Sequence, residues 1–151
     1  MSVFKNHKGF TLVELIIVVA LAAFLSGIGV WYATSTAPAF RLNGAVSLVR
    51  GDLYTAKVRA AKNNRQYNVV FTTNGYQVQR GTSGAGSFTA DAVEITRTFA
   101  EYPGITVKAD ATDDPVFSPR GISTAGTITL QNTSGDTKSI TMSIAGRIKV
   151  N

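Results

Sequence analysis

The sequence predicts an α+β fold, in which a long N-terminal helix spans a membrane and continues into an amphipathic half that packs on an antiparallel β-sheet domain. Three observations support this prediction: an apolar run from Phe10 to Tyr32, a helical spacing of apolar residues between Leu42 and Ala60, and several short strand-like segments beyond Gln66. A long helical region followed by a series of strands is typical of an α+β protein.

The composition argues against an enzyme. The chain has 151 residues, no cysteine and one histidine, His7. This excludes disulfides, thiolate metal sites and cysteine nucleophiles, and it leaves no histidine for a catalytic triad in the body of the protein. The net charge is +6, and 44% of the residues are hydrophobic while 16% are charged, as expected for a chain with a packed core. We therefore expect a non-enzymatic protein without a cofactor.

The apolar run predicts a transmembrane helix over residues 10–32. Glu14 is its only charged residue. As a helix the run would measure about 34 Å, close to the roughly 30 Å hydrocarbon thickness of a bilayer. Lys5 and Lys8 precede the run, which favours a cytoplasmic N-terminus.

A cleaved secretory signal peptide is the alternative, because Ala20-Leu21-Ala22 resembles its small-residue cleavage site. Two features oppose it: the apolar run continues through Trp31, and Glu14 interrupts a segment that should be purely apolar. A carboxylate inside a bilayer costs about 2.5–3.5 kcal/mol on insertion scales. Glu14 therefore either has a function or reaches back to the headgroups.

Residues 33–66 are predicted to form an exposed helical half. Pro38 removes a backbone donor and disfavours helical geometry at Ala37, so we expect a kink or a short break there. The helix then resumes with one narrow apolar face, whose members recur every three or four residues. They are Leu42, Val46, Val49, Leu53, Ala56 and Ala60.

The flanks and back of this helical half are basic, and Asp52 is the only accompanying acid. Such a surface is either a solvated face of a helix packed on a sheet or a contact for nucleic acid or anionic lipid. The basic residues are Arg41, Arg50, Lys57, Arg59, Lys62 and Arg65.

A β-hairpin is predicted directly after the helix. Two strand-like segments flank Asn74-Gly75, which is the strongest short hairpin signal. A two-residue turn there would place Phe71 opposite Val78 on one face. The glycine-rich residues 81–87 that follow are expected to form a flexible loop.

Residues 67–151 are assigned to an antiparallel β domain. Ile140, Met142 and Ile144 alternate with polar residues, as in a half-buried strand. The expected strands are residues 67–71, 76–80, 93–100, 105–108, 127–131, 138–144 and 147–150.

The start of the apolar run resembles the N-terminus of type IV prepilins and type II secretion pseudopilins. The resemblance rests on Lys8-Gly9-Phe10-Thr11-Leu12-Val13-Glu14 and the apolar residues that follow. In that family a membrane peptidase cuts after the glycine and methylates the new amino terminus. The resemblance implies that residues 1–9 are a cleaved leader, that Gly9 precedes the cut, that Phe10 is the N-methylated first mature residue, and that Glu14 is the assembly acid.

The resemblance also implies a location and partners. The protein would be a single-pass protein of the bacterial inner membrane with a periplasmic C-terminal domain, and it would join other pilins in a filament with the help of the inner-membrane assembly machinery. Prepilin peptidase would process it, and lipid would surround residues 10–32. A charged Phe10 amine and a Glu14 carboxylate on neighbouring subunits would neutralise each other in lipid, where unpaired charges are costly.

Three further segments resemble the GspH/FimT group of minor pilins and pseudopilins. They are Val116-Phe117-Ser118-Pro119-Arg120-Gly121, the closing Ile144-Ala145-Gly146-Arg147-Ile148-Lys149-Val150, and the helix of residues 48–64 that runs directly into a strand. Together with the N-terminal motif they span nearly the whole chain, with residues 81–115 carrying little. The sequence does not distinguish a subunit of a type IV pilus from a subunit of a type II secretion pseudopilus.

The chain has one acidic cluster, formed by Asp110, Asp113 and Asp114. Carboxylate oxygens at this spacing could hold Ca²⁺, but a calcium loop normally offers more carboxylates and a glycine turn. Solvated loop acids are the simpler interpretation, and we predict no metal site.

Three functions remain open at this point. The first is a filament subunit, and the second is a FimT-like minor pilin that binds DNA for uptake. The third is a membrane-anchored periplasmic binding module, which Gly9 and Glu14 disfavour. For DNA, Arg147 and Lys149 resemble the glycine-arginine-x-arginine element of FimT-type pilins, with lysine in the final place, and Arg120 is a third candidate contact. The alternative for these residues is a solvated strand edge that discourages aggregation.

Overall fold

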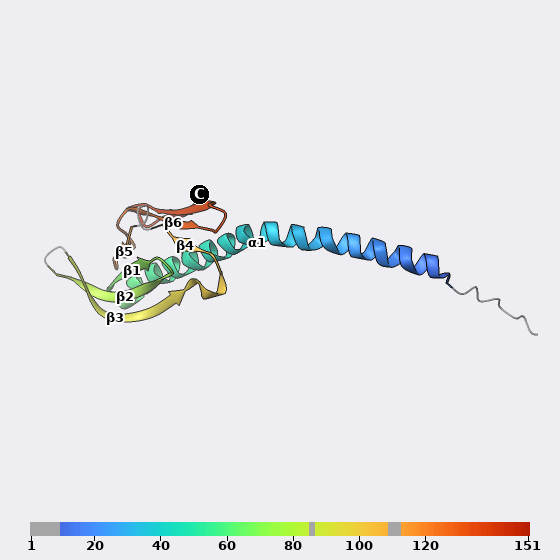
Figure 1. The fold of residues 1–151 in the computed structure, drawn as a ribbon. Helices are drawn as coiled ribbons and strands as arrows, with labels where there is room; N and C mark the ends of the chain where they lie inside the picture. The colour runs from blue at the N-terminus through green and yellow to red at the C-terminus, as the bar shows by residue number, and fades with distance from the viewer. Residues whose placement is uncertain (1–9, 85–86, 109–112) are drawn as a thin grey trace, which may run out of the picture. The chain divides into compact units, whose positions relative to one another are not determined.

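The computed structural model describes residues 10–84, 87–108 and 113–151, and Figure 1 shows their fold. In these residues one long helix, α1 (Leu12–Asn63), precedes eight strands. The chain divides into two compact units, Met1–Ala37 and Pro38–Asn151. The α+β prediction is confirmed, since α1 precedes two antiparallel sheets.

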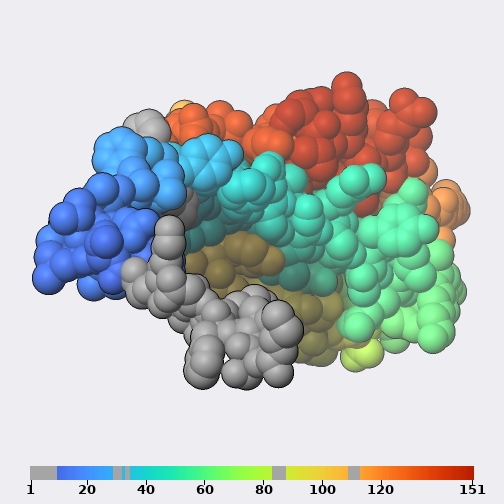
Figure 2. Space-filling model, turned by 90° about the vertical axis from the view of Figure 1, so that its right-hand side faces the viewer, coloured from blue at the N-terminus to red at the C-terminus, as the bar shows by residue number. Residues whose placement is uncertain are grey.

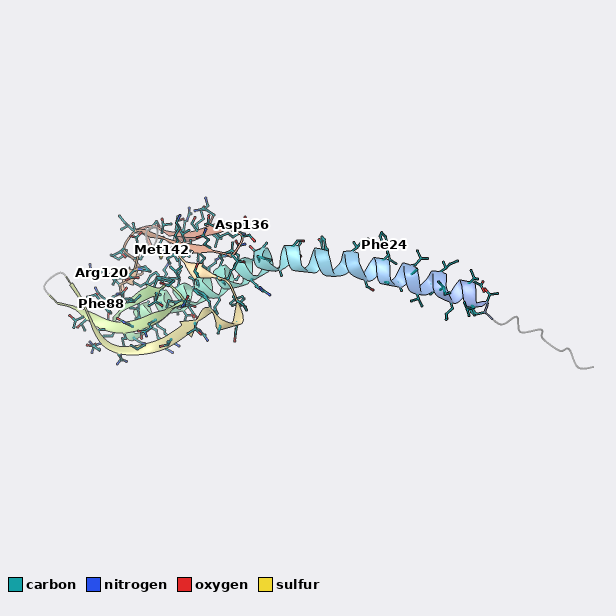
Figure 3. All side chains as sticks on the ribbon, in the orientation of Figure 1. Phe24, Phe88, Arg120, Asp136 and Met142 are labelled. Atoms are coloured by element: carbon teal, nitrogen blue, oxygen red, sulfur yellow. The ribbon has the colours of Figure 1, made fainter. Side chains whose placement is uncertain are left out.

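The first unit holds the N-terminal part of α1. Every large apolar side chain described between Phe10 and Ile28 is exposed, and Figure 3 shows Phe24 projecting from the helix. Among the described residues, no helix has both the length and the hydropathy needed to span a membrane.

Of the two alternatives expected at Pro38, the short break is wrong, because α1 is continuous through this residue, and the kink stays a prediction. A proline removes one hydrogen bond from the helical ladder, and the bonds on either side can hold the helix together. Nearby, the hydroxyls of Ser35 and Thr36 both donate to the Tyr32 carbonyl, at 3.0 and 2.9 Å. These side chains bond within the helix instead of ending it.

The C-terminal half of α1 buries the predicted apolar face. Its six predicted members are all buried, and Ala45 joins them. The helix ends at Asn63, and Asn64 takes the left-handed conformation with a φ of 51°. Arg65 N–H then bonds the Ala60 carbonyl at 3.3 Å, the pattern of a Schellman motif. This end turns the chain directly into the first strand.

The first sheet, sheet A, has the strand order β3-β2-β1-β5. All neighbouring strands are antiparallel. Its strands are β1 (Gln66–Thr72), β2 (Gly75–Gly84), β3 (Ser87–Thr98) and β5 (Val116–Phe117). β5 was not among the predicted strands, because two residues are too few to show an alternating pattern.

The predicted hairpin exists, but its register is wrong by two residues. Phe71 pairs with Tyr76, and Val78 pairs with Val69 instead of Phe71. The turn residues are Thr73 and Asn74, since Gly75 already belongs to β2.

Contacts from other segments account for this register. Phe99 N–H bonds the Asn74 carbonyl and Val107 N–H bonds the Thr73 carbonyl, both at 2.9 Å. A Cβ on Gly75 would lie 2.1 Å from the carbonyl oxygen of Arg97, so this position needs a glycine inside the sheet.

The glycine-rich segment is also different from the predicted loop. Residues 81–84 continue β2, and Ser87 already begins β3; residues 85–86 lie outside the described part. Gly81 is buried against β3, where a Cβ would lie 2.0 Å from the Thr89 carbonyl oxygen. The glycine therefore allows close approach of two strands, and it does not mark a loop.

The second sheet, sheet B, has the strand order β4-β6-β7-β8 and is likewise antiparallel. Its strands are β4 (Thr106–Val107), β6 (Gly126–Gln131), β7 (Thr137–Met142) and β8 (Ile148–Val150). Ile140 and Met142 are buried as predicted, but Ile144 lies beyond the end of β7 and is 68% exposed. A short 3-10 helix, η1 (Phe99–Glu101), replaces the end of the predicted strand 93–100.

One hydrophobic core joins the two sheets to α1. In Figure 1, β6 of sheet B lies above the C-terminal half of α1, and β2 and β3 of sheet A lie below it. The core includes Leu53 of α1, Val78 of sheet A and Ile140 of sheet B, each fully buried. The opposite face of this helical half stays open to solvent, and Figure 2 shows it from outside.

Candidate functional site

The N-terminus of α1 carries the first candidate site. Thr11 and Glu14 form a capping box. Glu14 N–H donates to Thr11 Oγ1 at 3.2 Å, while the backbone N–H and the hydroxyl of Thr11 donate to Glu14 Oε2 at 3.0 and 3.1 Å. A carboxylate at this place also interacts favourably with the positive end of the helix dipole. Glu14 thus fixes the residue at which α1 begins.

The predicted cleavage position adjoins this box. Phe10 is 84% exposed and immediately precedes the N-cap residue Thr11. Gly9 lies outside the described residues, as do Lys5 and Lys8. An amine created at Phe10 would be two residues before the first helical residue, Leu12.

A tight turn between β7 and β8 carries Arg147. Gly146 N–H bonds the Ser143 carbonyl at 2.8 Å, and Ser143 N–H bonds the Arg147 carbonyl at 3.0 Å. Gly146 has a φ of 72°, and a Cβ there would lie 2.2 Å from the Gly121 carbonyl oxygen. Only glycine fits this turn without strain.

The turn is held against α1 by Lys57. Its Nζ donates a hydrogen bond to the Gly146 carbonyl at 2.9 Å, across 89 positions of sequence. From the other side, Ser123 donates its hydroxyl to the Ser143 carbonyl at 2.9 Å, and its N–H bonds the Ile144 carbonyl at 3.1 Å. Three segments therefore set the position of Arg147: α1 through Lys57, the segment around Ser123, and the turn itself.

This arrangement places Arg147 in a surface groove between α1 and the β7–β8 turn. The groove has a volume of about 520 Å³. We call it the helix–turn groove, and it is lined by Ser47, Arg50, Gly51, Tyr54, Lys57, Gly146, Arg147 and Ile148. Figure 2 shows the red C-terminal residues lying along the teal part of α1 in this region.

The other two predicted DNA contacts do not line this groove. Lys149 is exposed on β8, which begins only at Ile148, so Arg147 lies just outside the strand that was expected to carry both residues. Arg120 is exposed in the turn after β5 and lines a different hollow, together with Asn64. In Figure 3, Arg120 and Asp136 lie towards opposite ends of the second unit, Pro38–Asn151.

Tyr54 was not predicted from the sequence as a site residue. The sequence also did not predict that Arg50, Lys57 and Arg147 line one groove. The signal within the helix was present, since residues 50, 54 and 57 recur at steps of four and three and share one helix face. Their proximity to Arg147 depends on a contact between distant segments, which helical spacing does not contain.

A buried polar cluster ties α1 to sheet A. Tyr76 donates its hydroxyl to Asp52 Oδ2 at 2.7 Å, and Arg97 Nε donates to the same oxygen at 3.0 Å. Burial, together with the hydrogen bond to Asp52, raises the pKa of Tyr76 far above its ordinary value. The hydrogen bond to Asp52 also raises the pKa of Arg97. All three groups are satisfied by one another, which indicates a structural role.

A second cluster surrounds Glu94 of β3. Arg59 of α1 donates to its Oε2 at 2.8 Å, the Tyr67 hydroxyl donates to its Oε1 at 2.8 Å, and Arg80 lies 3.7 Å away. Asn63 donates in turn to the Tyr67 hydroxyl at 2.7 Å. Burial and the hydrogen bond to Glu94 raise the pKa of Tyr67. Arg59 is therefore engaged within the fold.

Two members of the acidic cluster that was considered for Ca²⁺ and interpreted as solvated loop acids accept backbone hydrogen bonds. Asp113 Oδ2 accepts the Thr127 N–H, and Asp114 Oδ1 accepts the Phe71 N–H, both at 2.8 Å. Asp110 lies outside the described residues. Within the described part of the chain, no group of three or more histidine, cysteine, aspartate or glutamate residues could hold a metal ion.

A long N-terminal helix that begins in a capping box with Glu14, and whose second half packs on antiparallel sheets, defines a pilin-like subunit. The chain belongs to the GspH family: the family model of the type II transport protein GspH matches residues 45–146. The model of the prokaryotic N-terminal methylation motif matches residues 4–30. These matches confirm the predicted family.

Solved structures show the same fold. The type IV minor pilin FimU of Pseudomonas aeruginosa superposes with a TM-score of 0.56 at 20% identity, over 73% of this chain and 87% of FimU. A second crystal form of FimU gives 0.55 at 19% identity, over 73% of this chain and 92% of FimU. The minor pseudopilin EpsH of the Vibrio cholerae type 2 secretion system gives 0.57 at 11% identity, over 74% of this chain and 96% of EpsH. No curated protein sequence matches the chain significantly.

The chain is thus a minor pilin or pseudopilin of a type IV pilus or a type II secretion system. Members of this family are structural subunits that assemble with other pilins or pseudopilins into filaments. The methylation motif implies a prepilin-type N-terminal anchor in the inner membrane.

Proposed function

We propose that this chain is stored in the inner membrane as a single-pass protein and is then extracted and stacked into a filament by an assembly machinery. Residues 10–32 anchor it in lipid, residues 33–66 continue the helix, and residues 67–151 form the periplasmic β domain. The cytoplasmic N-terminus follows from Lys5 and Lys8. We assign a non-catalytic role, because the Asp52 and Glu94 clusters both use their polar groups to hold α1 against sheet A.

The observation that carries this proposal is the capped start of α1 directly after Phe10. Cleavage by prepilin peptidase after Gly9 removes the leader, residues 1–9, and leaves Thr11 and Glu14 in place as the first helical cap. The methylated Phe10 amine of one subunit then pairs with Glu14 of its neighbour. This pairing neutralises two charges that lipid would otherwise isolate, and it sets the axial register between subunits.

Intact-mass measurement of the membrane-extracted protein tests the maturation step. We expect a mass that corresponds to residues 10–151 with one methyl group on the amine. A soluble periplasmic protein that starts near Ala23 would instead show removal of a signal peptide and would overturn the proposal. Recovery of the mature chain in sheared filament fractions tests its incorporation.

A second candidate function is weak DNA binding for uptake, through Arg147, Lys149 and Arg120. The position of Arg147 in a groove with two other cations favours it. With so few phosphate contacts, binding should be weak, insensitive to sequence and strongly salt-dependent. Lysine at residue 149 keeps the charge but lacks the bidentate fork of arginine.

Titration of labelled duplex DNA with the full chain in zwitterionic detergent, at about 50 mM salt, tests this function. The matched variant is Arg147→Ala/Lys149→Ala. Absence of binding by the wild type, or equal binding by the double variant, would exclude a DNA site at these residues.

A further inference from the structure

The helix–turn groove brings together cations from two distant segments. Arg50 and Lys57 come from α1, and Arg147 comes from the β7–β8 turn; no described residue that lines the groove is acidic. Its volume of about 520 Å³ lies within the roughly 300–1,000 Å³ that is typical of small-ligand sites. The groove is therefore large enough for a nucleotide-sized anion.

The cations are available for a ligand. Arg50 and Arg147 are exposed, and among the described residues neither forms an ion pair, whereas Arg59, Arg80 and Arg97 are each paired with an acid. Lys57 gives one hydrogen bond to the Gly146 carbonyl, and an ammonium group has two further donors. Two guanidinium groups that have no carboxylate partner are suited to bind phosphates.

An open aromatic ring lies among these charges. Tyr54 lines the groove and is 63% exposed. Gly51, one turn before it on the same helix face, adds no side chain, and a Cβ there would meet no atom within 4 Å. The ring and Ile148 give the groove an apolar part beside its charged part.

We propose that the helix–turn groove binds a short single-stranded nucleic acid segment, with its phosphates on Arg50 and Arg147 and one base stacked on Tyr54. A single strand alternates charged phosphates with flat rings, which matches this lining. The bases of a duplex are already stacked and paired and cannot use the tyrosine, and an acidic peptide would use the arginines alone. The inference rests on the second candidate function, weak DNA binding. It changes the proposed contacts to Arg50, Tyr54 and Arg147, and it specifies single-stranded nucleic acid as the ligand.

Fluorescence anisotropy with a labelled oligothymidine of about 12 nucleotides tests the proposal, again with the full chain in zwitterionic detergent. Tyr54→Leu should weaken binding about 5- to 100-fold, the loss expected for one stacked base. Arg50→Ala should weaken it and reduce its salt dependence. Gly51→Leu should abolish binding by filling the groove, and it should fold normally because the added side chain enters open space and leucine favours a helix more than glycine.

Matched controls lie on the same helix outside the groove. Phe40→Leu removes an aromatic side chain that is 71% exposed, and Arg41→Ala removes an exposed arginine; neither residue lines the groove. Both variants should bind oligothymidine as the wild type does. Circular dichroism of every variant confirms that the fold is intact.

The outcomes separate this proposal from the DNA-binding function. If binding falls in Arg147→Ala/Lys149→Ala but is unchanged in Tyr54→Leu and Gly51→Leu, the groove proposal is wrong while the function stands. If the wild type binds no nucleic acid, both are wrong. If an abasic oligomer or a polyglutamate peptide binds with the same affinity as oligothymidine, binding depends on charge alone. That result would overturn the proposal that a base stacks on Tyr54.

Discussion

The carboxylate of Asp52 accepts the hydroxyl of Tyr76 at 2.7 Å, and this contact joins the inner face of α1 to the middle of sheet A. Arg97 donates to the same oxygen from β3. Asp52 is the only acidic residue in the C-terminal half of the helix, and it is buried. The acid is therefore part of the packing between helix and sheet and does not belong to the basic surface around it.

Asp52→Ala should destabilise the fold by about 2–3 kcal/mol, because it leaves the buried Tyr76 hydroxyl without an acceptor. Arg97→Ala should cost much less than Asp52→Ala, since the arginine side chain is exposed and water can replace its partner. Urea unfolding followed by circular dichroism measures both values. Equal stability of Asp52→Ala and the wild type would contradict the structural role of this contact.

The same contact makes stability sensitive to alkaline pH. Because the pKa of Tyr76 is raised in the folded chain, the folded state holds this proton more tightly than the unfolded state. The contribution is complete below about pH 10, where an unfolded tyrosine is still protonated, and is lost as the pH rises above it. As the pH rises from about 10 to 11.5, the unfolding free energy of the wild type should fall more steeply than that of Tyr76→Phe, and the difference in slope should approach about 1.4 kcal/mol per pH unit. Parallel curves for the two proteins would refute the assignment.

The capping box predicts different results for its two residues. Thr11→Ala should weaken the first helical turn by about 1 kcal/mol and still permit filament incorporation, because the Glu14 charge remains. Glu14→Gln retains a side-chain acceptor for the Thr11 N–H but removes the charge, and it should block incorporation, as should Glu14→Ala. Immunoblots of sheared filaments and of membranes measure assembly and insertion separately.

Insertion of both Glu14 variants should equal or exceed that of the wild type, since a charge has been removed from an apolar helix. Normal assembly of Glu14→Gln would show that capping, and not charge pairing, is what the glutamate provides. Failure of Thr11→Ala as well would mean that the shape of the first turn limits assembly.

Gly146→Ala should destabilise the β7–β8 turn and displace Arg147. The alanine Cβ would have to occupy a left-handed conformation and would lie 2.2 Å from the Gly121 carbonyl oxygen, so the turn must move. Hydrogen exchange should rise at Ser143 and Gly146, whose N–H groups are bonded within the turn. Gly51→Ala is the control, because its Cβ meets open space and the exchange of the turn should not change. Unchanged exchange in Gly146→Ala would contradict this account.

Features that depend on local spacing were predicted well from the sequence. The inner face of α1 follows from the helical recurrence between Leu42 and Ala60, and the prepilin motif follows from Gly9, Phe10 and Glu14 in order. Both patterns involve residues that are close in sequence. Each can be interpreted from those residues alone, without knowing which distant segments they contact.

Features that depend on contacts between distant segments were not predicted. Asn74-Gly75 was interpreted as a turn, but Gly75 is a strand residue because β3 approaches it closely. Gly81 has the same role further along β2. The helix–turn groove exists because Lys57 bonds a carbonyl 89 positions away, which no pattern within one element can show. In each case a contact between distant segments decides what the glycine or lysine does in the fold.

Between β3 and β6 the chain changes sheet three times: β4 belongs to sheet B, β5 returns to sheet A, and β6 goes back to sheet B. Neither four-stranded sheet is therefore encoded by a continuous stretch of sequence. Such interleaving joins both sheets in one cooperative unit and raises the mean sequence separation of native contacts, which slows folding. A newly synthesised subunit would consequently expose incomplete sheet edges until the described strands of both sheets had formed, and exposed sheet edges promote misassembly between copies during this interval.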